Sequence, residues 1–166
     1  MGKAIIRTAK ASDCEALAQL RCTYVTNQYQ GYLLPDLGEQ NHPEAYLPRF
    51  LEAVNQPTRV LEVLEMGGKL CGYVLYGPDT DAEGWGLLVE AICLTDSEHL
   101  QLLIQYALKS LAAMGYPQVH VWAMHDNFRL RYLYEQCGFR RDGTQRTQSC
   151  SDGQLFFMRY QYTRQA

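Results

Sequence analysis

Apolar residues recur along this chain with two spacings, one close to two residues and one close to 3.6. The first spacing is typical of strands and the second of amphipathic helices. Helices are expected from about residue 12 to the polar stretch at 27–31, from 43 to 54, from 98 to 114 and from 128 to 136. Strands are predicted over 4–6, 59–66, 69–76, 87–94, 118–123, 145–150 and 155–162.

Several local signals define the ends of these elements. Ser12 and Thr95 each stand three residues before a Glu, the pattern of a capping box that opens a helix. Pro43 suits a helical first turn, whereas Pro48 is expected to kink or split the same helix. The pair at 67–68 is Gly-Gly between two β-rich runs, which predicts a hairpin.

The clearest helical stripe belongs to the third helix. Its apolar residues occur at successive offsets of three, four, seven, eight and eleven, so they share one face. The stripe consists of Leu100, Leu103, Ile104, Ala107, Leu108 and Leu111.

The order of the predicted elements is β-α-α-β-β-β-α-β-α-β-β. A hairpin, a βαβ unit and a closing hairpin in this order predict an α/β (α+β) fold, with a mixed twisted sheet of about seven strands and helices on both faces. A chain of 166 residues that is 47% hydrophobic can bury a core as one domain, so we expect residues 1–166 to form a single domain.

Composition narrows the class of protein. A formal net charge of −3 without a basic run gives no indication of nucleic-acid binding. No stretch of about 18 apolar residues predicts a membrane span. Six scattered cysteines without C-x-x-C pairs favour reduced thiols in a cytoplasmic protein, and the four histidines lack metal-ligand spacing. We therefore expect no metal site.

The most specific motif is D-N-F-R-L-R-Y-L-Y-E-Q-C-G-F at 126–139, which follows the apolar strand V-H-V-W-A. With I-R-T-A-K-A-S-D at 6–13, Y-Q-G-Y-L-L-P at 29–35 and G-Y-V-L-Y-G-P at 72–78, it stands in the order and spacing of the GNAT acyltransferase superfamily. The chain resembles this superfamily over almost its whole length.

The resemblance implies an N-acyltransferase that moves an acetyl group from acetyl-CoA to a small-molecule or protein amine. In the family, acyl-CoA enters a V between two splayed parallel strands, here 87–94 and 118–123. A backbone N–H near the end of the first strand holds the thioester carbonyl. The resemblance also makes a homodimer an open possibility.

The resemblance also assigns roles to residues. Tyr134 would protonate the leaving thiolate. Similar sequences often carry a Glu at the place of Leu88, and Glu90, expected on the same face as Leu88 and Ile92 by a period of two, is the candidate base in its stead. The expected cofactor-binding residues are Ile92, Cys93, Leu94, Asn127, Arg129 and Arg131. The expected acceptor-binding residues are Tyr29, Tyr32 and Leu33.

Each of these residues also has a structural interpretation. Tyr134 falls on the apolar stripe of its helix and can simply be core. Asn127 or Asp126 can be a helix N-cap. Glu90 can be a solvated carboxylate, and Cys93 with His120 on the neighbouring strand is more simply a buried thiol than a nucleophile.

The family's phosphate loop, Q/R-x-x-G-x-G/A, has no counterpart here. Residues 94–101 read L-T-D-S-E-H-L-Q, without glycine or arginine, and Asp96 and Glu98 occupy the expected first helical turn. Such carboxylates stabilise a helix N-terminus but repel a pyrophosphate. Besides the acetyltransferase, two hypotheses follow: a non-catalytic binding module that has lost acetyl-CoA, and a transferase for an acyl donor without pyrophosphate.

Overall fold

The computed structural model describes residues 3–28, 41–150 and 153–165, and the order of its helices and strands is the predicted one. A 3₁₀ turn, Ala11–Asp13, precedes the first helix. The helices are α1 (Cys14–Gln28), α3 (Pro43–Asn55), α4 (Ser97–Ala113) and α5 (Phe128–Gln136). The strands are β1 (Ala4–Thr8), β2 (Val60–Met66), β3 (Lys69–Pro78), β4 (Gly86–Cys93), β5 (Gln118–Met124), β6 (Arg140–Cys150) and β7 (Gly153–Thr163).

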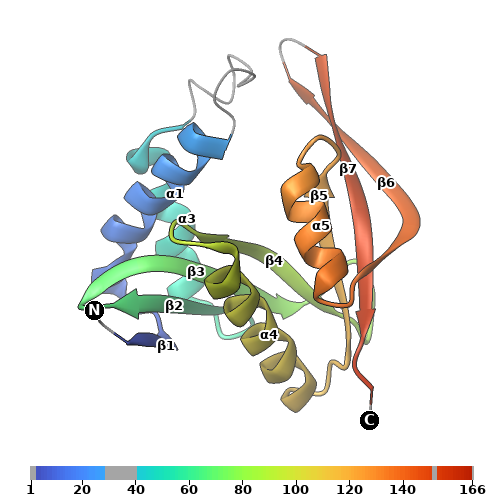
Figure 1. Ribbon diagram of the computed structural model, residues 1–166, viewed down its shortest axis with the longest axis horizontal. Helices are drawn as coiled ribbons and strands as arrows, with labels where there is room; N and C mark the ends of the chain where they lie inside the picture. Colours follow the sequence, from blue (N-terminus) through green and yellow to red (C-terminus); the bar gives the residue numbers. More distant parts are fainter. Residues whose placement is uncertain (1–2, 29–40, 151–152, 166) are drawn as a thin grey trace.

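The strands form one mixed sheet in the order β1-β2-β3-β4-β5-β7-β6. Every neighbouring pair is antiparallel except β4 and β5, which α4 connects as a parallel crossover. The predicted seven-stranded mixed α/β fold is therefore confirmed. In Figure 1 the strands β1–β4 and the strands β5–β7 form two halves that diverge towards the top of the view.

Helices cover both faces of the sheet, and each face has its own apolar core. On one face α1 and α3 pack on β2 and β3 around Leu17, Phe50 and Tyr73. On the other face α4 and α5 pack around Leu103, Tyr134 and a set of strand residues (Figure 1). The stripe predicted for the third helix lies entirely in this second core, with all six members buried.

Two predicted N-caps were wrong, one by two residues and the other by one. Ser12 lies inside the 3₁₀ turn, where Asp13 instead accepts the Lys10 N–H at 2.8 Å. Asp13 is held there by Arg7, whose guanidinium donates to it at 2.9 Å. Before α4 the N-cap is Asp96, one residue after Thr95. Asp96 takes the position expected for Thr95, because Asp is at least as good an N-cap as Thr. The N-cap before the 3₁₀ turn is instead Lys10, whose N–H is the one that Asp13 accepts.

Two further turn and helix predictions have clear outcomes. The Gly67–Gly68 turn joins β2 and β3 with φ values of 59° and 79°, the left-handed region that glycine adopts without penalty, so the predicted hairpin is confirmed. Pro48 does not split its helix, because α3 continues through it from Pro43 to Asn55. Within the described ranges, no helix has the length and apolar character needed to cross a bilayer.

A matched pair of leucines tests the α4 packing. Leu103 is completely buried, whereas its neighbour Leu102 is 49% exposed. We expect Leu103→Ala to lower the free energy of unfolding by about 2–5 kcal/mol, because it leaves a cavity in the core. Leu102→Ala should change it by no more than about 0.5 kcal/mol. Urea unfolding of both variants measures the difference, and equal effects would contradict this packing.

Candidate active site

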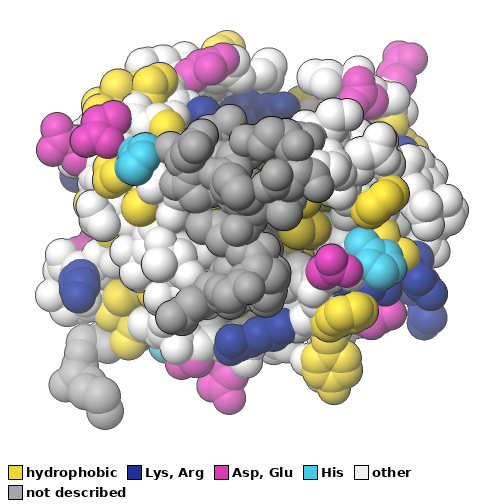
Figure 2. All heavy atoms as spheres, turned by 90° about the horizontal axis from the view of Figure 1, so that it is seen from above, with side chains coloured by type: hydrophobic (Ala, Val, Ile, Leu, Met, Phe, Trp, Pro, Cys, Tyr) yellow, Lys and Arg dark blue, Asp and Glu magenta, His cyan; other side chains and the backbone are white. Residues whose placement is uncertain are grey.

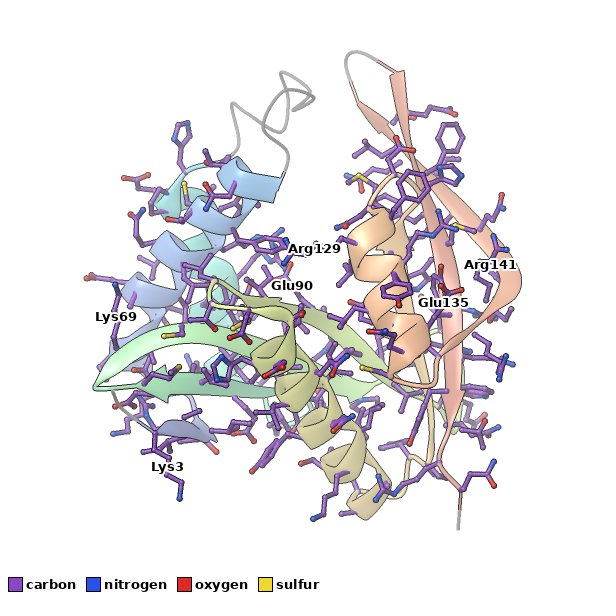
Figure 3. All side chains as sticks on the ribbon, in the orientation of Figure 1. Lys3, Lys69, Glu90, Arg129, Glu135 and Arg141 are labelled. Atoms are coloured by element: carbon purple, nitrogen blue, oxygen red, sulfur yellow. The ribbon has the colours of Figure 1, made fainter. Side chains whose placement is uncertain are left out.

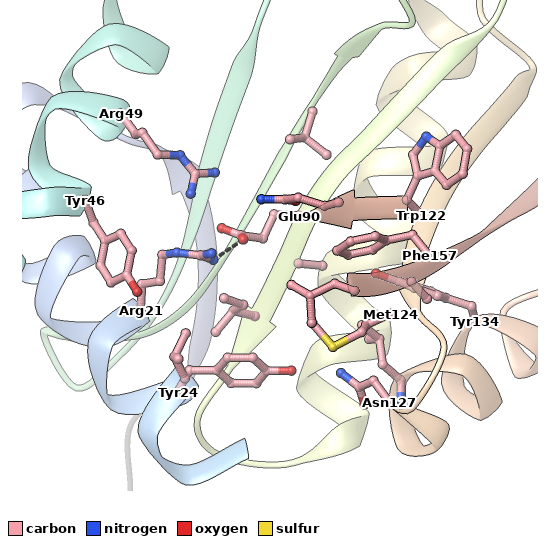
Figure 4. Close-up of a pocket in the computed structure, with 18 of the residues that line it drawn as sticks. Arg21, Tyr24, Tyr46, Arg49, Glu90, Trp122, Met124, Asn127, Tyr134 and Phe157 are labelled. Atoms are coloured by element: carbon pink, nitrogen blue, oxygen red, sulfur yellow. Dashed lines mark hydrogen bonds and ion pairs between the residues drawn. The ribbon is translucent and has the colours of Figure 1, made fainter. Parts of the chain in front are cut away.

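The site begins where the two parallel strands separate. β4 and β5 pair only from Gly86–Leu88 to Val119–Val121, and no ladder joins them beyond that point. The predicted splay is thus confirmed. A cavity of about 610 Å³ occupies the opening, with residues 89–92 of β4 on one wall and residues 122–124 of β5 on another (Figure 4). This volume is within the range of small-molecule sites.

A β-bulge in β4 decides which side chains face this cavity. Leu75 of β3 pairs with Glu90 and Tyr76 pairs with Leu88, so Val89 is an extra residue in β4. A bulge reverses the alternation of side chains that follows it. Leu88 consequently lies in the core of α4 and α5, whereas Ile92 lies in the core of α1 and α3. The expectation that Glu90 shares a face with both was wrong, because Glu90 stays only with Ile92.

Glu90 lies at the centre of a polar cluster on the wall formed by α1 and β3. Its carboxylate accepts a hydrogen bond from the Arg21 guanidinium (Figure 4). It also accepts one from the Tyr73 hydroxyl. Burial, together with Glu90, raises the pKa of Tyr73 well above its usual value, so the phenol remains a donor. Burial by itself would lower the pKa of Arg21, but the attraction of Glu90 more than offsets it, and the guanidinium stays charged. Glu90 is therefore an ion-paired carboxylate rather than a solvated one.

Tyr134 comes to the cavity from α5 on the opposite side. It lines the cavity while only 2% exposed, and Figure 4 shows its hydroxyl directed towards the opening. Its ring packs on Phe139 and Tyr160, with centroids 5.6 and 6.3 Å away. Tyr134 is thus a core residue, as its structural interpretation proposed, and also part of the cavity wall.

Asn127 combines two positions in the same way. Its side chain caps α5 by accepting the Leu130 N–H at 3.2 Å, so the N-cap interpretation is confirmed. Asn127 also lines the first cavity and a second one of about 430 Å³. It therefore marks the junction between the two cavities.

Three consecutive residues at the end of β4 and just after it, Ile92, Cys93 and Leu94, are expected to bind the cofactor, but their N–H groups do not all point the same way. The Leu94 N–H donates to Cys71 of β3 at 2.8 Å. Because N–H groups alternate in direction along a strand, that of Ile92 also points towards β3, and those of Ala91 and Cys93 point into the opening. Among the predicted residues only Cys93 directs an amide at the slot, and Ala91, which the sequence did not suggest, does so too.

The second cavity lies between the N-terminus of α4 and the helix α5. Cys93, Leu94 and Asp96 line it on one side, and Arg129 lines it on the other. Figure 3 shows Arg129 reaching from α5 towards the gap. The Asp96 carboxylate accepts the His99 N–H at 2.8 Å and so occupies the N-terminal end of α4 itself. The Asp96 carboxylate thus occupies the position at which the N-terminus of α4 would attract a bound anion.

The outer rim of α5 is exposed and aromatic. Phe128 and Tyr132 are more than 60% exposed, and His125 lies 6.2 Å from Phe128 between ring centroids. In Figure 2, which views the molecule from above, hydrophobic and histidine side chains lie side by side near the lower right.

Several predicted site residues lie elsewhere. Arg131 lines neither cavity, because it donates to the His125 carbonyl at 2.7 Å and to the Tyr160 hydroxyl at 3.0 Å. Cys93 contacts Thr95, whereas His120 bonds to Asp79 at 2.9 Å, so the structure does not bring them together as a nucleophile and base. The predicted acceptor-binding residues, Tyr29, Tyr32 and Leu33, lie outside the described residues.

Other cavity residues were not anticipated from the sequence. Nothing in the local pattern around them distinguishes them from ordinary surface or core positions. They include Arg21, Tyr24, Arg49, Trp122 and Arg146. Among the described residues no group of three His, Cys, Asp or Glu side chains is arranged to hold a metal ion.

Comparison with solved structures finds the same architecture in N-acetyltransferases. PaiA N-acetyltransferase from Thermoplasma acidophilum in complex with coenzyme A has a TM-score of 0.74 and 17% identity, over 96% of this chain and 99% of that one. Ribosomal-protein-alanine N-acetyltransferase from Brucella melitensis has a TM-score of 0.71 and 19% identity, over 96% and 99%. A GNAT-family protein from Desulfovibrio desulfuricans has 0.68 and 15%, over 97% and 99%.

No protein-family model and no curated protein matches the chain in sequence. The likeness therefore rests on structure, and it extends over nearly the full length of each compared chain. The chain has the fold of the GNAT N-acetyltransferases, which confirms the resemblance carried by its motifs.

The Asp96 cap leads to a prediction about stability. Asp96→Ala removes the acceptor of the His99 N–H, and we expect it to lower the free energy of unfolding by about 0.5–2 kcal/mol. Asp96→Asn keeps a capping oxygen and should stay within about 0.5 kcal/mol of the wild type. Chemical denaturation of the two variants is the measurement. A loss of the same size in both would mean that the charge, rather than the hydrogen bond, supports α4.

Proposed function

We propose that this protein is an N-acetyltransferase that uses acetyl-CoA to acetylate an amine. The observation that carries the proposal is the slot between β4 and β5, which has Tyr134 on one side and Glu90 on the other. The GNAT fold supports it, because the compared structures of this fold include N-acetyltransferases and one of them is a complex with coenzyme A.

The slot suits the acyl end of the cofactor. Cys93 and Ala91 direct their N–H groups away from β3 into a region where β5 no longer supplies ladder partners. Such amides can pair with the amide groups of an extended pantetheine arm, and one of them can donate to the thioester oxygen as negative charge develops there. Asn127, at the junction of the two cavities, is the proposed further contact to this arm.

Acetyl-CoA supplies an activated acetyl group, whose C–S bond breaks as the C–N bond to the amine forms. In this proposal Tyr134 donates its proton to the departing sulfur. The ammonium proton of the acceptor leaves to Glu90, directly or through a water molecule, before attack. The second proton, which the nitrogen loses as the amide forms, restores the hydroxyl of Tyr134 through solvent. Arg21 and Tyr73 hold Glu90 through charge-assisted hydrogen bonds and so fix its position beside the slot.

The second cavity suits the pyrophosphate of acetyl-CoA less well than the slot suits the acyl end. Asp96 already caps α4, and its negative charge faces the second cavity. Arg129 on the opposite wall is the proposed phosphate contact.

The Asp96 cap also favours a second candidate function, which is a GNAT-fold binding module without acetyl-CoA turnover. A related candidate is a transferase for an acyl donor that has no pyrophosphate. A thermal-shift comparison of coenzyme A with acyl-pantetheine distinguishes the donors.

Titration calorimetry with acetyl-CoA tests the cofactor assignment. We expect measurable binding by the wild type. Asp96→Asn should bind roughly fivefold more tightly, since removing one exposed like charge near the phosphates relieves about 1 kcal/mol. The same substitution should not change the affinity for acyl-pantetheine, which has no pyrophosphate. No binding of acetyl-CoA at millimolar concentration by either protein would refute the proposal.

Turnover tests the role of Tyr134. We expect Tyr134→Phe to lower kcat by roughly 10²–10⁴-fold with little change in the affinity for acetyl-CoA, since only the acidic proton is removed. Tyr106→Phe is the matched control, because Tyr106 is a partly exposed residue of α4 outside both cavities. A Tyr134→Phe enzyme with unchanged kcat would remove Tyr134 from the chemistry.

A further inference from the structure

We infer that the acceptor is a small amine that carries a carboxylate, with acidic amino acids as the favoured class. The inference rests on the proposed function and assigns the substrate class of the same site. It follows from the charges that line the larger cavity.

That cavity is basic although the protein is acidic. The chain has a formal net charge of −3. The charged residues of the cavity, however, are Arg21, Arg49, Arg146 and Glu90. Glu90 is ion-paired with Arg21, so two positive charges are left without compensation among the lining residues. A low-dielectric wall concentrates such a field inside the cavity.

Arg146 is held in a geometry that suits recognition of an acid. Its guanidinium lies 4.3 Å from the Trp122 ring centroid and 5.5 Å from that of Phe157. Stacking on aromatic rings fixes the plane of a guanidinium while its edge remains able to bind a carboxylate through two parallel hydrogen bonds. The neighbouring Arg159 also approaches Trp122, but Asp142 neutralises it at 2.6 Å. Among the described residues Arg146 has no such carboxylate.

Arg49 approaches the cavity from the other wall. It comes from α3, and Figure 4 shows its guanidinium directed towards the same opening as that of Arg21. Within the described ranges it forms no ion pair with a carboxylate. Cations therefore stand on the α3 wall and on the β6 wall, an arrangement that suits a ligand with two acidic groups.

The same charges affect the nucleophile. A nearby positive charge disfavours a second one, so the arginines lower the pKa of an acceptor ammonium while they hold its carboxylate. The neutral amine, which is the form that attacks the thioester, becomes more populated. A polyamine should bind poorly, because the arginines repel each of its positive charges and it has no carboxylate for them to bind.

Direct binding tests this inference without any turnover. Ligand-detected NMR of the full chain, with L-glutamate and with putrescine as probes, should show glutamate binding that weakens with salt and little putrescine binding. Arg49→Gln and Arg146→Gln should each weaken glutamate binding roughly tenfold, the loss expected for a charge-assisted contact. Arg141→Gln, on the same strand β6 but outside the cavity, is the matched control and should behave as wild type.

Turnover provides the second arm. With acetyl-CoA fixed, kcat/KM for glutamate should exceed that for its dimethyl ester, which keeps the amine and masks the acids, by roughly tenfold or more. The arginine variants should lower kcat/KM for glutamate more than for the ester, and so reduce this preference to roughly threefold or less. Preferred binding of putrescine, or glutamate binding that is insensitive to both substitutions, would overturn the inference. Normal glutamate binding without acetyl-CoA binding would instead refute the proposed function alone.

Discussion

The separation of β4 from β5 is the constraint on which the rest of this site depends. The strands pair as far as Leu88 and Val121 and then diverge. Backbone N–H groups of β4 that would bond to β5 in a continuous sheet are therefore directed into an opening. The bulge at Val89 lies at the same point and turns Glu90 towards α1 rather than into the α4 core. The end of the β4–β5 pairing thus provides the slot, and the adjacent bulge in the β3–β4 pairing provides its carboxylate.

The two cavities that meet at Asn127 differ in charge. The larger one has arginines on opposite walls and one ion-paired glutamate, whereas the smaller one has the Asp96 cap opposite Arg129. A bound anion is therefore favoured in the larger cavity and opposed at the N-terminus of α4. The stability of α4 and the affinity for a pyrophosphate make contrary demands on the same position, because a single carboxylate can cap the helix only by occupying its anion site.

The sequence motifs predicted part of the candidate site. They selected Tyr134, Asn127 and Glu90, and all three line the larger cavity. They failed where a residue's surroundings come from distant segments. Arg131 has the same local sequence context as Arg129, yet it bonds to Tyr160 of β7 while Arg129 reaches the second cavity. The N-cap of α4 was missed by one residue because Asp and a neighbouring Thr give nearly the same sequence signal.

By itself the sequence determined the order of helices and strands, the α4 stripe and the Gly67–Gly68 hairpin, because these depend on spacing and backbone preference over a few residues. Only the tertiary structure decided which face of β4 carries Glu90 and that the larger cavity is basic. The cavity gathers side chains as far apart in the chain as Arg21, Arg49 and Arg146. Their proximity follows from sheet topology and from one bulge, and no local pattern of residues encodes either of them.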